Sequence, residues 1–152
     1  NRRGIMDKRE EALEKVMVYF NGGYNCCESV VMAVCDYLGA DKEIPQKIAT
    51  PFGAGMSKNG SNCGALNAAF ICMGLVGGRR SSEDSKDTSF LPADRIFGKF
   101  KEKYGSTFCY DITGLDMKKT AETEEEKAKR HNELCGPLVL QVTQWILEEL
   151  NP

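Results

Sequence analysis

Residues 62–78, NCGALNAAFICMGLVGG, decide the fold of this chain. Apart from Asn67 and Gly74, the stretch is apolar nearly all round from residue 65 to residue 76. A helix that is hydrophobic on every side belongs in the centre of a bundle, and this run is too short to cross a bilayer. The sequence therefore predicts a buried central helix that begins near Asn62 and ends at the paired glycines.

Helical periodicity continues on both sides of this stretch. Asn25 starts a second helix, with Glu28 three residues later in the spacing of a capping box. No strand-like alternation of useful length is found, so we predict an all-α, single-domain multi-helix bundle over residues 1–152. The apolar faces that support it are Leu13, Val16, Met17 and Phe20; Val30, Val31, Val34 and Leu38; Ala93, Ile96, Phe97, Phe100 and Tyr104; and Leu138, Val142, Trp145, Ile146 and Leu150.

The segments between these faces are shorter or more polar. Residues 44–49 predict a short helix, and residues 51–60 predict a glycine-rich loop. Residues 79–89 are rich in Ser and Asp and predict an exposed loop. Residues 117–130 carry Glu and Lys at helical spacing, which is typical of a helix exposed to solvent.

Composition limits the functional classes. The chain has 152 residues, of which 41% are hydrophobic and 28% are charged, with a net charge of −2, as expected for a globular protein. A nucleic-acid partner is not expected, because sequence-independent binding needs a surplus of Lys and Arg. The first ten residues are charged, so no signal peptide is predicted. We expect a cytoplasmic protein without direct membrane insertion.

The chain has seven cysteines and no C-x-x-C motif. Thiols stay reduced in the cytoplasm, so this number indicates metal binding, redox chemistry or burial rather than a disulfide framework. The odd count also fits poorly with a fully paired scaffold. The lack of C-x-x-C argues against a zinc ribbon and a bacterial ferredoxin pattern.

Four of the cysteines lie where four different helices are expected to begin: Cys26, Cys63, Cys109 and Cys135. A helix N-terminus carries unpaired N–H groups and a partial positive charge. A thiol placed there loses its proton more easily, and the thiolate is the form that binds metals and does redox chemistry. We therefore expect helix N-termini to converge on one site for redox chemistry or metal binding, with these four cysteines as its residues.

Other residues are expected to support this site. Asn25 caps the helix that begins at Cys26. Gly64 and Gly136 leave room for a backbone or a cluster to approach the neighbouring cysteine. Gly53 and Gly55 belong to the tight loop that delivers the chain to Cys63, where the central helix is expected to begin.

The remaining cysteines and the single histidine are weaker candidates. Cys35 and Cys72 lie inside apolar helix faces, where a cysteine is usually a small hydrophobic residue. Cys27 adjoins Cys26 but points about a quarter-turn away on a helix. His131 lies four residues before Cys135 and could be a ligand or a base, although its charged neighbours favour an exposed position.

The cysteine pattern resembles a redox-active protein family named for the arrangement C…C-G-A-x-x-G…C…C. The resemblance covers nearly the whole chain, from about residue 20 to residue 150. One residue departs from the pattern, because Ala68 replaces the last glycine of the central element. The matching residues are Gly23-Tyr24-Asn25-Cys26, Phe52-Gly53-Ala54-Gly55-Met56, Cys63-Gly64-Ala65, Gly105-Ser106 with Cys109, and Cys135.

The resemblance implies a helical cytoplasmic protein with four characteristic cysteines, a redox role and genes near transporters. Our leading hypothesis is an iron–sulfur or other metal–thiolate centre that passes electrons to a redox partner protein. The first alternative is a metal-free thiol–disulfide oxidoreductase. The second is a structural zinc or cysteine interaction module associated with a membrane transport system. The abundance of short apolar helices also makes a homodimer plausible.

Overall fold

The computed structural model describes residues 7–151 and, within that range, every side chain except those of residues 120–123. The ends of the predicted domain, residues 1 and 152, lie outside this part. The helices are α1 (Lys8–Asn21), α2 (Cys26–Leu38), α3 (Glu43–Ala49), η1 (Thr50–Phe52), α4 (Gly53–Lys58), α5 (Gly64–Gly77), α6 (Asp87–Tyr104), α7 (Cys109–Thr113), α8 (Thr120–Arg130), η2 (His131–Cys135) and α9 (Gly136–Leu150). In the described part no strand forms, and an isolated bridge pairs Asn62 with Phe108. The all-α prediction is confirmed.

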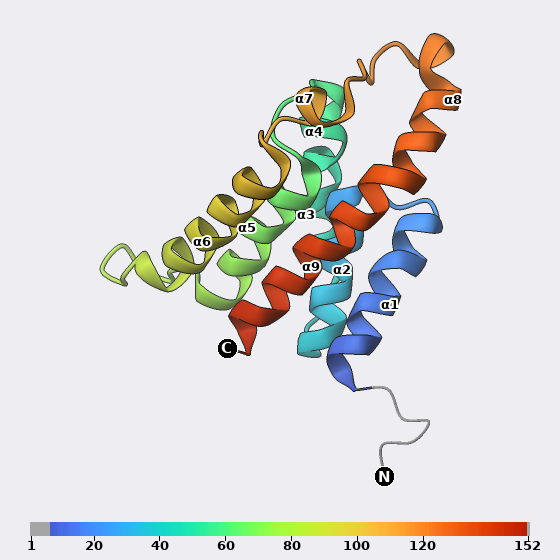
Figure 1. The fold of residues 1–152 in the computed structure, drawn as a ribbon. Coiled ribbons are helices and arrows are strands. Elements are labelled where there is room, and N and C mark those ends of the chain that lie inside the picture. Colours follow the sequence, from blue (N-terminus) through green and yellow to red (C-terminus); the bar gives the residue numbers. More distant parts are fainter. Residues whose placement is uncertain (1–6, 152) are drawn as a thin grey trace.

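Helix α5 is the central helix, as its sequence predicts. It packs against α2, α6 and α9, while α1 packs against α2 and α9 (Figure 1). Leu66, Ala69 and Met73 of α5 are fully or almost fully buried in the same core as Val31 of α2 and Ile146 of α9. Burying one side chain of this size contributes roughly 1.5–3 kcal/mol, so this shared core is the main source of the bundle's stability.

Local signals fix where the helices start and stop. The capping box of α2 is present: the Glu28 N–H donates to Asn25 Oδ1 at 2.8 Å, and the Asn25 N–H donates to Glu28 Oε1 at 2.9 Å. Gly39 and Gly105 end α2 and α6 in the left-handed conformation, with φ of 67° and 79°. Glycine has no Cβ to clash in that conformation, which is why these two residues stop their helices.

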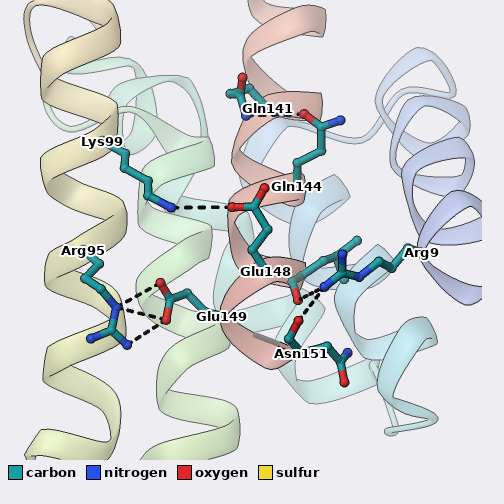
Figure 2. A network of polar contacts seen from close by, with 9 residues as sticks. Arg9, Arg95, Lys99, Gln141, Gln144, Glu148, Glu149 and Asn151 are labelled. Carbon is teal, nitrogen blue, oxygen red and sulfur yellow. Dashed lines mark hydrogen bonds and ion pairs between the residues drawn. The ribbon is translucent and has the colours of Figure 1, made fainter.

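Polar contacts fasten the C-terminal end of α9 to its neighbours (Figure 2). Arg95 of α6 donates from Nε and Nη2 to the Glu149 carboxylate, with the shortest distance 2.7 Å. Arg9 of α1 donates to the carbonyl oxygens of Leu147 and Asn151 at 3.3 and 2.7 Å. These contacts lie at the end of α9 that is far from α8 (Figure 1).

The segment between α3 and α5 differs from the predicted loop. Residues 50–52 form a 3₁₀ turn, and Gly53 starts a turn in which Ala54, Met56, Ser57 and Lys58 all have positive φ. Gly55 lies among them, so the turn is a short left-handed helix. Each residue other than glycine in this conformation costs roughly 1–2 kcal/mol. Such strain persists only where the surrounding structure imposes it, and it is concentrated at functional sites.

The second difference lies between α8 and α9. The helical backbone runs without a break from α8 through the π turn η2 into α9, and Figure 1 shows them as one long rod. The Gly136 N–H donates to the His131 carbonyl, which is the i→i+5 bond of a π turn. Such turns occur mostly as single insertions in α-helices, frequently at functional sites.

Among the described residues, no helix combines the length and the apolar character that a membrane span needs.

Candidate functional site

A cavity of about 240 Å³ lies where α2, α5 and α7 begin and where α8 meets α9. Cys26, Cys63, Cys109 and Cys135 all line it. Much of the remaining wall is apolar and includes Phe20, Ile112, Leu138 and Val139. The structure thus brings the four predicted cysteines to one cavity, while their role as redox or metal-binding residues stays a prediction.

Three of the four cysteines lie at the start of a helix, as the sequence predicts. Cys26 and Cys109 are the first residues of α2 and α7, and Cys63 is the N-cap of α5. Cys135 also precedes a helix, but its backbone is already helical and continuous with the π turn. Because the N–H groups after it are engaged in that continuous helix, Cys135 receives less of the helix-terminus effect than the other three.

Close backbone packing surrounds the Cys26 sulfur. A Cβ added to Gly64 would lie 2.3 Å from Cys26 Sγ and 3.1 Å from both Gly53 Cα and the Phe52 carbonyl oxygen. Only glycine fits at this position, because a contact of 2.3 Å is far inside van der Waals distance. The predicted supporting role of Gly64 therefore has a steric basis. Without a side chain at this position, the Cys26 sulfur can lie against the backbone of the residue that follows Cys63.

Asn25 links the start of α2 to the 3₁₀ turn. Its side-chain Nδ2 donates to the Thr50 carbonyl at 3.0 Å, and Thr50 Oγ1 donates to Glu28 Oε2 at 2.7 Å. Gly53 passes so close that an added Cβ would lie 2.3 Å from Asn25 Cγ. Asn25 and Gly53 therefore pack directly against each other. Because Asn25 caps the helix that begins at Cys26, this contact fixes the backbone beside that cysteine.

Asn67 is a supporting residue that the sequence analysis missed. It is 7% exposed, and its Nδ2 donates to the carbonyls of Phe52 and Asn62, both at 3.1 Å. Its Oδ1 accepts from Asn62 Nδ2 at 2.8 Å. The sequence signal that could have identified Asn67 is its position in an otherwise apolar helix, because a buried amide there needs hydrogen-bond partners. Asn67 fixes the turn before Cys63 against the 3₁₀ turn.

Backbone hydrogen bonds hold Cys63 and Cys109 side by side. The Cys63 N–H donates to the Thr107 carbonyl at 2.8 Å, and the Cys109 N–H donates to the Ser61 carbonyl at 2.7 Å. Gly55 fits against this pair, because an added Cβ would lie 2.6 Å from Cys109 Cβ. The left-handed turn therefore packs directly on the segment that carries Cys109. This contact explains why a glycine is needed at position 55.

His131 occupies the cavity wall rather than a fully exposed helix face. Its ring stacks on Phe20 with 3.9 Å between ring centroids, and Nε2 lies 3.1 Å from the Phe20 carbonyl oxygen. It is half-buried, which differs from the exposed position that its neighbours favoured. Gly136 follows Cys135 and has limited space, since an added Cβ would lie 3.2 Å from the His131 carbonyl oxygen.

The other three cysteines lie in the core. Cys27, Cys35 and Cys72 are fully buried, and none of them lines the cavity. The interpretation of Cys35 and Cys72 as small hydrophobic residues fits these positions. Cys27 belongs to the same buried core cluster. All seven cysteines of the chain are free thiols in the structure.

Burial raises the thiol pKa at each cysteine of the cavity. It raises the pKa of Cys135 to about 12, and it also raises the pKa of Cys26, Cys63 and Cys109. Backbone hydrogen bonds at Ala54, Cys27, Cys26 and Gly64 act in the opposite direction on the Cys26 pKa but do not cancel the effect of burial. This outcome reverses the expectation from helix N-termini alone, because desolvation of the thiolate outweighs the local N–H groups.

The described side chains, those of residues 7–119 and 124–151, give no preformed site for a single metal ion. Among them, no three His, Cys, Asp or Glu side chains come together closely enough to hold one ion. Four cysteines nonetheless line one largely apolar cavity. Cysteine sulfur is a ligand of both iron–sulfur clusters and zinc, so these residue types suit a metal–thiolate centre.

Fold and cavity together define an all-α protein with a four-cysteine site. The chain belongs to the family described as "Putative redox-active protein (C_GCAxxG_C_C)", whose model matches residues 24–149. No curated protein and no solved structure matches the chain. The departure at Ala68 lies in the core, since this residue is fully buried on α5 and does not line the cavity.

Proposed function

We propose that this redox-active protein transfers electrons through an iron–sulfur cluster or another metal–thiolate centre held by Cys26, Cys63, Cys109 and Cys135. The observation that carries the proposal is the meeting of these four thiols, from four separate parts of the chain, at one largely apolar cavity. When bound, such a centre supplies reversible one-electron chemistry that no protein side chain here offers.

The surroundings of Cys26 support a bound centre. Burial raises the pKa of Cys26, and backbone N–H groups, including those of Ala54 and Gly64, partly offset that rise because they interact favourably with the ionised sulfur. Hydrogen bonds of this kind to cysteine sulfur tune the potential of iron–sulfur proteins. A metal also removes the problem that burial creates, because a coordinating thiol is deprotonated outright.

The electron partner is proposed to be another redox protein. Tyr24, Phe108 and Tyr110 are exposed large hydrophobic residues, and each is within two residues of Cys26 or Cys109 in the chain. Exposed aromatic residues are enriched at protein interfaces, so this end of the molecule is a reasonable place for a partner to dock. A transport system, a homodimer and a cytoplasmic location remain predictions from the sequence.

The decisive experiment is anaerobic purification followed by iron, sulfide and visible absorption measurements. We expect iron, inorganic sulfide and a broad visible charge-transfer band, all of them lost or strongly reduced in Cys63→Ser. Cys35→Ala and Cys72→Ala are the matched controls, because both remove a fully buried thiol away from the cavity. Wild-type protein that contains neither iron nor sulfide would sink the cluster proposal, and one zinc per chain without a redox response would favour the structural alternative.

A metal-free thiol–disulfide enzyme is the second candidate. Its support is that the Cys26 sulfur, at the start of α2, lies against Gly64, the residue after Cys63. In this reaction Cys26 and Cys63 form a disulfide, while an acceptor disulfide takes up their two electrons and two protons to become two thiols. Its difficulty is burial, which raises the pKa of both thiols and keeps them protonated at neutral pH.

The two candidates predict different pH dependence for the metal-free, reduced protein. Because the pKa of each cavity thiol is raised, we expect the iodoacetamide alkylation rate to keep increasing with pH beyond the ordinary cysteine pKa of about 8.5. Mass spectrometry of each cysteine-containing peptide measures this rate site by site. A plateau below neutral pH at Cys26 would indicate an activated thiolate and would favour the thiol–disulfide enzyme.

A further inference from the structure

Helix α8 is attached to the bundle differently from the other long helices. Among its described side chains, residues 124–130, none is buried. Lys127 and Arg130 are half-buried, and their spacing of three places them on one face of the helix. Both residues line the cysteine cavity. Figure 1 shows α8 continuing α9 in one rod, so the lining residues of α8 and the π turn that follows them belong to one wall of the cavity.

Two side-chain hydrogen bonds join this face of α8 to the segment that follows Cys109. Arg130 Nε donates to the Thr113 carbonyl at 3.0 Å, and Lys127 Nζ donates to the Met117 carbonyl at 3.2 Å. Thr113 is the last residue of α7 and is itself buried; its Oγ1 donates to the Cys109 carbonyl at 2.8 Å. Arg130 is therefore connected, through one residue, to the backbone of Cys109.

The same arginine is close in the chain to Cys135. It is the last residue of α8, and the π turn His131–Cys135 follows it directly. Glu126 lies one helical turn before it, with Oε2 at 3.3 Å from Arg130 Nη1, and this ion pair orients the guanidinium. Thus Arg130 connects two separate segments of the cavity wall: the α7 segment with Cys109 and the α8–α9 rod with Cys135.

We propose that Arg130 is a positioning residue that latches α8 over the cysteine cavity by binding the end of α7. In the closed arrangement it holds the segments of Cys109 and Cys135 together and limits access to the cavity. The π turn is the place where α8 moves relative to α9 when the latch opens. That the latch protects a redox centre rests on the proposed function. The latch itself can be tested in the metal-free protein.

Alkylation of Cys109 in the metal-free, reduced protein tests the latch. Cys109 is 9% exposed, so a reagent reaches it mainly when the cavity opens. At one fixed pH, we expect Arg130→Gln to increase the iodoacetamide rate at Cys109 on the order of tenfold, as for loss of a charge-assisted hydrogen bond. If the only effect of the substitution were the loss of a positive charge, the alkylation rate would fall, because a positive charge favours the reactive thiolate.

The matched control is Arg95→Gln, which removes an arginine from an ion pair with Glu149 at the other end of α9 (Figure 2). It is expected to leave the Cys109 rate unchanged. An Arg130→Gln rate equal to or below that of wild type overturns the latch. If Arg130→Gln does not fold, Lys127→Gln removes the second bond to the same segment and is expected to increase the rate as well. Iron analysis of the wild-type protein judges the redox centre separately.

Discussion

Gly64→Ala is expected to lower the free energy of unfolding by about 3 kcal/mol and to abolish the cysteine centre. In the interior of a helix, a glycine-to-alanine change normally stabilises the protein by about 0.5–1 kcal/mol. At this position the new methyl group would lie 2.3 Å from Cys26 Sγ and 3.1 Å from two backbone atoms. Overpacking of this kind costs typically 1–3 kcal/mol and displaces what it meets, here a sulfur of the site.

Gly74→Ala provides the control in the same helix. An added Cβ at Gly74 meets nothing within 4 Å, so this variant is expected to be more stable than wild type by about 0.5–1 kcal/mol. Urea unfolding of both variants, with iron content and the visible spectrum measured in parallel, checks the prediction. Two stabilised variants with intact spectra would show that the Cys26 sulfur does not lie against Gly64.

Much of the fold could be predicted because the local signals agree with the packing. The apolar character of residues 65–76 indicates the central position of α5, and that helix is central. The capping box predicted the start of α2, and both of its hydrogen bonds are present. Where local preference and tertiary packing point to the same structure, periodicity and cap residues are sufficient.

The left-handed turn could not be predicted from its sequence. Ala54, Met56, Ser57 and Lys58 carry no preference for positive φ, and a glycine-rich segment usually forms an irregular loop. Tertiary contacts impose the conformation: Gly55 lies against Cys109, which is more than fifty residues away in the chain. No window of the sequence contains both partners, so the constraint is visible only in the folded molecule.

For the site, the positions of the cysteines could be predicted better than their chemistry. The four cysteines line one cavity, Gly64 packs against Cys26 and Gly55 against Cys109, while the functional role of these residues stays a prediction. The expected fall in thiol pKa is wrong, because the depth of the cavity was unknown and burial dominates. Arg130 was also missed, because its charged neighbours favour an ordinary exposed helix and its partner Thr113 lies in another segment.

The loss of the Asn67 amide is expected to have the second largest effect on stability. Asn67→Leu keeps the branched shape and the number of heavy atoms but removes the donors to the Phe52 and Asn62 carbonyls and the acceptor for Asn62 Nδ2. Leaving buried polar partners unpaired costs about 1–3 kcal/mol, so we expect the free energy of unfolding to fall by about 2–3 kcal/mol. A leucine at this position would otherwise favour the helix and the core, which makes the sign of the change informative.

The site is expected to respond as well, since Asn67 holds the turn before Cys63 against the 3₁₀ turn beside Asn25. Urea unfolding measures the stability change, and the alkylation rate of Cys63 in the metal-free protein measures whether the turn has loosened. Asn59→Ala is the control. The Asn59 side chain is exposed, donates to the Met56 carbonyl at 2.9 Å and accepts from Lys118 Nζ at 2.7 Å, so the loss of these exposed bonds should change stability by no more than about 0.5 kcal/mol. If Asn67→Leu is as stable as wild type and Cys63 reacts no faster, the amide does not hold the two turns together.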